Sequence, residues 1–395
     1  MTTITEERRD RPQAPEARKQ EKATLVSGIV DADDRRGYLR VSGYRRSPGD
    51  VPITHAQIRQ FGLRMGDMAE AEAEAEPGPG RRDGNGGRQG KTLISVTTVN
   101  GLPAAEAAMR PRFDDLTPVY PNQRFRLEDG DPSPAARIID LVSPIGKGQR
   151  GLIVAPPKAG KTTVLKTIAH AIATAYPEVH LMLVLVGERP EEVTDLRRSV
   201  RGEVISSTFD QSPDDHVRAA ELAIERAKRL AELGRDVVVM LDSLTRLGRA
   251  YNLAAPASSR TLTGGVAVSA LQPPRKFLGA ARCLEEGGSL TILSTALIDT
   301  GSQLDNVLFE EFKGTGNMEL RLRRDLAEKR IFPAIDPVPS GTRREDLLMS
   351  SGEHAAVVSL RRALAALDSQ HAMELLLEKT TGPNEQLLRQ VHASR

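Results

Sequence analysis

The chain has 395 residues, 39% of them hydrophobic, and a net charge of +2, which indicates a water-soluble protein of two or three domains. Its single cysteine excludes an intrachain disulfide and fits a reducing compartment. Because no apolar run is long enough to cross a membrane and the N-terminus lacks the apolar segment of a signal peptide, we expect a cytoplasmic protein with no membrane partner.

The first quarter of the chain predicts a small β domain. Residues 1–23 are charged and have little to bury, so we expect a disordered leader. Over residues 24–100, short β-prone segments and one amphipathic helix, 55–61, are typical of an OB- or cold-shock-like β-barrel, a fold that often binds single-stranded nucleic acid. The expected strands are 25–30, 37–41, 51–53, 68–71 and 92–96. The Gly-rich segment 76–91 predicts a flexible excursion between strands, and the Pro-rich segment 101–135 predicts a linker.

Residues 136–395 change to an α/β pattern. Buried strands are expected at 151–155, 181–186, 237–241 and 290–296, with helical segments between them. One helix is well marked, because Ser212 and Pro213 are typical of its start and Gly234 of its end. The fold class is therefore α/β, and the alternation predicts a mainly parallel sheet with right-handed crossovers.

A phosphate-binding loop is predicted after the first of these strands. The apolar residues 152–154 run into Gly160-Lys-Thr162, and a helical pattern follows, which is the order of elements that a P-loop requires. Lys161 would reach the β- and γ-phosphates of ATP, and the Thr162 hydroxyl would ligate Mg²⁺. A chance Gly-Lys-Thr would lack the flanking strand and helix. The predicted nucleotide-contacting residues here are Ala155, Pro156, Pro157, Lys158, Ala159, Gly160, Lys161, Thr162 and Thr163.

Two later strands end in carboxylates. Asp242 follows an apolar strand and could hold Mg²⁺ through water, although alone it would fit a helix-capping Asp equally well. Glu188 follows another apolar strand and could orient the attacking water, the alternative being a surface Glu in a charged turn. With the P-loop upstream, the pattern favours the catalytic interpretation of both residues.

Several motifs together resemble the Rho family of bacterial transcription termination factors. They are 155–162, 188–194, 241–252, 262–265, 310–320 and 328–336, and the last two are not shared by P-loop ATPases in general. The resemblance covers residues 24–395 and implies a RecA-like motor domain behind an OB-like primary RNA site. It further implies a homohexameric, RNA-dependent ATPase and 5′-to-3′ RNA–DNA helicase that uses ATP and Mg²⁺. The implied partners are nascent RNA, RNA polymerase and transcription elongation factors.

The same resemblance assigns roles to individual residues. Glu188 resembles the catalytic base, Arg343 the arginine finger given to a neighbouring subunit, and Phe332 the aromatic that stacks on adenine. Arg189 and Arg246 resemble arginines that couple subunits and nucleotide. The implied RNA-binding residues are Tyr38 and Arg40 in the primary site, and Arg260, Thr261, Thr263, Gly264, Thr300, Gly301, Ser302 and Gln303 in two loops of the central channel.

The sequence departs from the family pattern at sites of RNA contact. Gln303 stands where a Lys is usual, and the primary site has Arg36, Pro52 and Gly90 where aromatic platforms are usual. Gly187 also replaces the usual Asp before the catalytic Glu. These departures leave the ATPase credible and keep open an alternative, a Rho paralogue with weakened RNA coupling that acts as a regulator or mixed-ring partner. A strand-exchange protein or rotary ATPase subunit is a third class, disfavoured by the OB-like domain and the 310–336 motifs.

Overall fold

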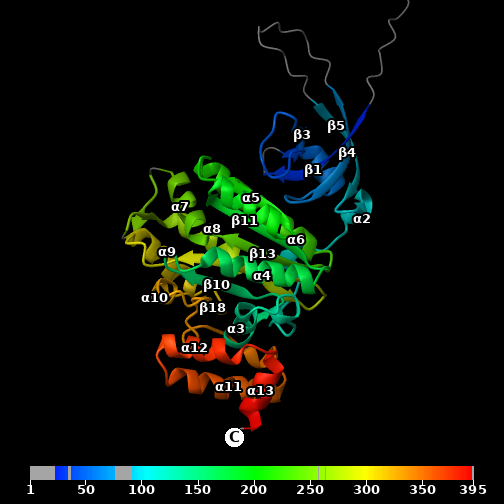
Figure 1. Cartoon of the computed structure of the whole chain (residues 1–395). Helices are drawn as coiled ribbons and strands as arrows, with labels where there is room; N and C mark the ends of the chain where they lie inside the picture. Colours follow the sequence, from blue (N-terminus) through cyan, green and yellow to red (C-terminus); the bar gives the residue numbers. More distant parts are fainter. Residues whose placement is uncertain (1–22, 34–36, 76–90, 257, 263, 394–395) are drawn as a thin grey trace, which may run out of the picture.

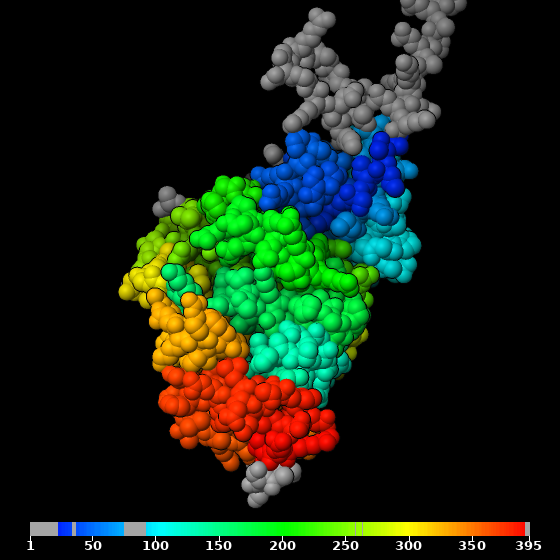
Figure 2. All heavy atoms as spheres, in the orientation of Figure 1, coloured from blue at the N-terminus to red at the C-terminus, as the bar shows by residue number. Residues whose placement is uncertain are grey.

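The computed structural model describes residues 23–33, 37–75, 91–256, 258–262 and 264–393. The predicted leader and excursion fall almost wholly outside these residues, as do Arg36, Gly90 and Thr263. An N-terminal β domain and a group of C-terminal helices lie at opposite ends of a central α/β domain (Figures 1 and 2).

The N-terminal domain is an antiparallel, barrel-like sheet with strand order β3-β2-β1-β4-β5-β6, which confirms the predicted OB-type fold. Strand β4 alternates Ala and Glu so that Ala69, Ala71 and Ala73 are buried while the Glu side chains face water, and it continues beyond the predicted segment to Ala75. The elements are β1 (Thr24–Ala32), β2 (Gly37–Arg40), β3 (Val51–Ile53), α1 (His55–Phe61), β4 (Met68–Ala75), β5 (Lys91–Val99), β6 (Leu102–Pro103) and α2 (Ala104–Ala107). The predicted helix α1 is confirmed and begins with a capping box at Thr54.

The segment predicted as a linker packs against both domains. Ala107 is buried in the barrel core, whereas Phe113 and Phe125 are fully buried in the cores of the α/β domain. Its elements are η1 (Phe113–Asp115), β7 (Pro118–Val119), β8 (Arg124–Phe125) and η2 (Leu127–Asp129). The domain boundaries drawn from the sequence stay predictions, because this segment contributes to both cores.

The α/β domain is built on a sheet with strand order β12-β11-β13-β17-β10-β18-β19, and its strands from β12 to β18 run parallel. The predicted parallel α/β fold is therefore confirmed, while β12 and β18 add strands that the sequence did not predict. The strands are β9 (Ile145–Gly146), β10 (Arg150–Ala155), β11 (His180–Glu188), β12 (Glu203–Thr208), β13 (Asp236–Asp242), β14 (Thr261–Leu262), β15 (Val266–Ala267), β16 (Arg282–Leu284), β17 (Ser289–Leu297), β18 (Met318–Arg321) and β19 (Gly341–Thr342).

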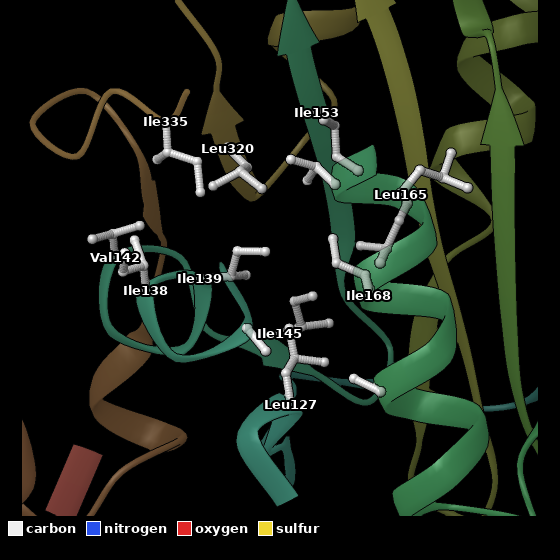
Figure 3. Close-up of a cluster of buried hydrophobic side chains, with 14 of the residues drawn as sticks. Leu127, Ile138, Ile139, Val142, Ile145, Ile153, Leu165, Ile168, Leu320 and Ile335 are labelled. Atoms are coloured by element: carbon white, nitrogen blue, oxygen red, sulfur yellow. The ribbon is translucent and has the colours of Figure 1, made fainter. Parts of the chain in front are cut away.

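Helices cover both faces of this sheet. Along β10, Ile153 faces a core shared with α3 and α4, whereas Leu152 and Val154 face a core shared with α6 and α7. Figure 3 shows the first core, where Ile139 of α3 and Ile168 of α4 gather with Ile153. The helices are α3 (Pro134–Val142), α4 (Lys161–Ala175), α5 (Pro190–Ser199), α6 (Pro213–Ala231), α7 (Leu244–Ala254), α8 (Val268–Gly279), α9 (Gln303–Lys313), α10 (Arg324–Glu328), η3 (Glu345–Leu347), α11 (Ser351–Ala365), α12 (Ser369–Lys379) and α13 (Asn384–Ala393).

The described helices include none that combines the length and apolarity needed to cross a membrane.

Helix α6 begins as predicted, because the Ser212 side chain accepts a hydrogen bond from the Asp215 backbone N–H.

Candidate active site

The predicted P-loop connects the buried strand β10 to helix α4. Gly160 has a φ of +88° at the N-cap of α4, a left-handed conformation that glycine adopts without a Cβ clash. The helix then begins at Lys161, so its first backbone N–H groups and positive dipole end point out of the loop. Pro157 and Lys158 are exposed, whereas Ala159 is buried beneath the loop. This arrangement can hold a phosphate group.

The P-loop lysine lies between the two predicted carboxylates. Lys161 Nζ is 3.2 Å from Glu188 Oε1 and also contacts Asp242 Oδ1. Both acids end neighbouring parallel strands, β11 and β13, whose carboxyl ends meet at the same sheet edge as the P-loop. The structure thus brings together three residues that the sequence separates by up to 81 positions.

Glu188 is poised to take up a proton. Its side chain is almost fully buried, and burial, followed by the nearby Asp242 charge, raises the pKa of the Glu188 carboxyl, while Lys161 and Arg246 oppose that shift. A carboxylate whose pKa moves toward the working pH is a better general base than an exposed one. The site can therefore deprotonate a water molecule held beside a γ-phosphate.

Two further residues orient the acids. Thr295 Oγ1 on β17 donates to Asp242 Oδ1 at 2.7 Å, and Arg246 Nη1 lies 2.8 Å from Glu188 Oε1. Arg246 was assigned only a coupling role by resemblance, and Thr295 was not predicted. In the sequence, Thr295 is only a hydroxyl residue near the end of an apolar strand. Its role becomes visible only once β17 is known to lie beside β13.

The donor set fits a magnesium ion brought in with nucleotide. Mg²⁺ prefers oxygen ligands and usually keeps waters and substrate phosphates around one or two protein groups. Thr162 lies in the first turn of α4 with a partly exposed hydroxyl side chain, and Asp242 supplies a buried carboxylate at the same edge. Magnesium at this site stays a prediction, with Thr162 and Asp242 as the residues that would hold it.

The predicted adenine-stacking residue lies over the P-loop. A Cβ placed on Gly160 would be 3.8 Å from the Phe332 ring, and this ring is 49% exposed. An exposed aromatic ring beside a phosphate loop offers a stacking surface for a base. Arg189 occupies the N-cap position of α5 directly after Glu188, and its side chain is 69% exposed, so it is available to a second chain.

The predicted arginine finger lies at the other end of the sheet. The Arg343 backbone N–H donates to Asn317 O at 2.8 Å, and Asn317 N–H donates to Arg150 O at 2.9 Å, so Arg343 sits beside the start of β10. At about 3.3 Å per residue, Arg150 and Ala155 lie roughly 16 Å apart along this six-residue strand. Arg343 therefore cannot reach the phosphate loop of its own chain.

The two predicted RNA loops adjoin each other. A Cβ on Gly264 would lie 3.2 Å from the backbone of Gln303, which places the β14–β15 turn against the start of α9. Arg260, Thr261, Gly264, Gly301 and Gln303 are exposed. Thr300 and Ser302 instead support the loop, since Thr300 Oγ1 donates to Asp305 and the Ser302 side chain caps α9.

Arg40 has partners that change its predicted role. Its guanidinium is bonded to Asp31 at 2.5 Å and to Asp50 at 2.5 Å, and its side chain is only 7% exposed. It also lies 5.0 Å from the centroid of the Tyr38 ring. Because two carboxylates already neutralise it, the geometry favours Arg40 as a support for Tyr38 over the predicted contact with RNA phosphates.

We expect Arg40→Ala to lower the free energy of unfolding of the barrel by about 3 kcal/mol, because it leaves the buried Asp50 carboxylate without its cation and removes one of the two cations that pair with Asp31. Arg46→Ala, at an exposed position in the turn after β2, should change the free energy of unfolding by less than about 0.5 kcal/mol. Denaturant titration of both variants measures the difference. Equal losses would mean that the Asp31–Arg40–Asp50 cluster does not stabilise the barrel.

Comparisons with known proteins agree with this architecture. Residues 135–342 match the ATP synthase alpha/beta family, nucleotide-binding domain, and residues 26–105 match the Rho termination factor, RNA-binding domain. A solved ATPase from the type III secretion system of pathogenic bacteria shares the fold, with a TM-score of 0.59 and 24% identity over 71% of this chain and 87% of that chain.

Similar sequences carry the name transcription termination factor Rho. The protein from Micrococcus luteus is 58% identical over 90% of this chain and 52% of its own length, and that from Streptomyces lividans is 56% identical over 97% and 54%. This chain thus spans about half the length of these two relatives. The protein from Streptosporangium roseum is 53% identical over 98% of both chains. The chain therefore belongs to the family of transcription termination factor Rho.

Proposed function

We propose that this chain is an RNA-dependent ATPase that moves 5′-to-3′ along nascent RNA as a homohexamer and ends transcription. The observation that carries the proposal is the convergence of Lys161, Glu188 and Asp242 at one sheet edge, with Arg343 at the opposite end of β10. A ring of identical subunits would bring the Arg343 of one copy to the phosphate loop of the next.

In the proposed reaction, water attacks the γ-phosphorus of ATP while Glu188 takes a proton from that water and ADP leaves. Lys161 would exchange its contacts with the two acids for the β- and γ-phosphates. Bound Mg²⁺ would neutralise phosphate charge, held by Thr162 and Asp242. Arg343 of the neighbour would neutralise the charge that develops on the transferred group.

RNA would pass the loops around Gly264 and Gln303. Glycines and hydroxyl side chains in exposed turns suit contact with a sugar-phosphate backbone, which carries no base identity. Their contact with each other supports a common RNA path. The barrel around Tyr38 would bind RNA first, and its affinity should depend on salt more than on base identity, since few aromatic platforms remain.

RNA polymerase and transcription elongation factors would be the partners, and the cytoplasm would be the location.

An unwinding assay tests the motor activity directly. We expect ATP-dependent release of a DNA strand paired to the 3′ part of an RNA with a single-stranded 5′ region. Equal release when the single-stranded region is 3′ would contradict the proposed direction.

We expect Gln303→Lys to lower the RNA concentration that gives half-maximal ATPase activity about fivefold, since one charged contact at an exposed site contributes about 1 kcal/mol. The salt dependence of this concentration should also become steeper, because the added charge displaces counterions. Gln386→Lys adds the same charge on α13 and serves as the matched control. If both variants behave alike, Gln303 does not face RNA.

A further inference from the structure

A loop of the N-terminal barrel reaches the strand beside the catalytic glutamate. Arg45 Nη2 donates to the Ser206 carbonyl oxygen of β12 at 3.1 Å. In the orientation that satisfies both neighbours, the Gln211 amide oxygen accepts from Arg45 Nη1 and Nη2 at 3.3 and 3.2 Å, and its nitrogen donates to Ser207 Oγ at 2.8 Å. The barrel is therefore linked through Gln211 to the buried Ser207 hydroxyl of the α/β domain.

The same hydroxyl holds a histidine. Ser207 Oγ lies 2.6 Å from His216 Nδ1 on α6. Since Ser207 Oγ already accepts from Gln211, its own proton is available to Nδ1. Burial lowers the pKa of His216, opposed by the Asp215 charge and aided by that of Arg246. In this hydrogen-bond arrangement the neutral ring accepts at Nδ1 and carries its proton on Nε2.

The protonated edge of this ring faces the catalytic turn. A Cβ built on Gly187 would lie 4.0 Å from His216 Nε2 and 3.4 Å from Arg246 Cδ. Arg246 binds this turn twice, since its Nη1 donates to the Gly187 carbonyl and pairs with Glu188 Oε1. Gly187 has a φ of +65° and no side chain to fix it, so the groups packed around the turn determine where Glu188 points.

We propose that Arg45, Gln211, Ser207 and His216 form a relay that positions the Gly187–Glu188 turn, so that docking of the barrel sets the rate of ATP cleavage. The inference rests on the proposed function and adds to it a route from the RNA-binding domain to the active site. All four are positioning residues, because the nearest of them acts on Glu188 through the Gly187 turn.

Other contacts hold both ends of the relay in place. Tyr44 OH, adjacent to Arg45, donates to Glu203 Oε1 at 2.7 Å, and Asp31 of the barrel pairs with Arg218 of α6. At the other end, Phe209 N–H donates to the Glu188 carbonyl at 3.3 Å, which joins the end of β12 to the catalytic residue. Because these contacts fix the surrounding backbone, displacement of Arg45 would change the hydrogen bonds of Ser207.

The experiment must separate a role of Arg45 in the relay from direct contact with RNA, because Arg45 lies in the barrel that is proposed to bind RNA. Arg45→Ala and Ser207→Ala should each lower kcat for ATP hydrolysis about tenfold at saturating poly(C), as loss of groups that orient an active-site residue does. The ATP KM and the poly(C) concentration for half-maximal rate should stay within about twofold of wild type. If Arg45→Ala instead raises the poly(C) requirement at unchanged kcat, Arg45 contacts RNA and the relay is wrong.

Ser206→Ala is the matched control, because it keeps the backbone carbonyl that accepts from Arg45 and removes only a hydroxyl that bonds Arg197, outside the relay. We expect it to keep wild-type kcat, and the double variant Arg45→Ala/Ser207→Ala to be no slower than the worse single variant, as coupled residues require. Multiplicative losses, or equal losses at Ser206 and Ser207, would overturn the relay. The kcat of each variant is compared with that of the wild-type protein. If poly(C) does not accelerate ATP hydrolysis by the wild-type protein, that result counts against the proposed function and not against the relay.

Discussion

Glu188→Gln should abolish ATP hydrolysis while leaving ATP binding intact. Gln keeps the size and the hydrogen-bonding ability of Glu188 but cannot accept a proton from water, and a positioned general base contributes about 10²- to 10⁴-fold to rate. Its raised pKa and its contact with Lys161 support the proposed role of Glu188 as the base. Phosphate release measures turnover, and equilibrium binding of a fluorescent ATP analogue measures affinity.

Glu192→Gln provides the matched control for this experiment. Glu192 lies on α5, one turn after Glu188, and has a partly exposed side chain. Loss of the Glu192 charge should leave the rate of ATP hydrolysis within about twofold of wild type, as expected for a surface position. If the two variants retain similar turnover, Glu188 is not the base and the site assignment fails.

Arg343→Ala should also stop turnover, and its defect should be repaired by a different inactive variant. Arginine fingers contribute about 10³- to 10⁵-fold to phosphoryl transfer. Because Arg343 lies roughly 16 Å along β10 from its own phosphate loop, the account requires a neighbouring chain to use it. Mixing Arg343→Ala with Glu188→Gln subunits then creates some interfaces with both groups intact, about a quarter of them in a randomly mixed ring.

Recovery of ATPase activity in the mixture is therefore the expected result, although each variant is inactive alone. Arg344→Ala is the control, because Arg344 is adjacent, exposed and paired with Asp346. A mixture that stays as inactive as its components would show that Arg343 serves its own chain or none.

The sequence predicts the elements whose signals are local. The amphipathic pattern of α1, the Ser212 cap of α6 and the strand–loop–helix order around Gly160 are each local signals, so they can be recognised without any tertiary contact. The ends of buried strands are also predictable, which is why Glu188 and Asp242 could each be placed at the end of a strand.

Contacts between distant segments could not be predicted in this way. Whether Arg40 meets RNA or carboxylates depends on Asp31 and Asp50, which only strand pairing brings to it. Strand β12 mixes Ser and Thr with few apolar residues, so its buried position comes from pairing with β11. For the same reason Ser207 and His216 carried no signal until the sheet and α6 were assembled.

The measurement that tests the central claim most directly is the steady-state rate of ATP hydrolysis by the purified chain with and without single-stranded RNA. We expect poly(C) to accelerate hydrolysis at least tenfold and Lys161→Ala to remove the accelerated rate, because the proposed function couples RNA at the loops of Gly264 and Gln303 to ATP at Lys161. Hydrolysis that is equally fast without RNA, or that survives Lys161→Ala, would contradict an RNA-dependent ATPase at this site.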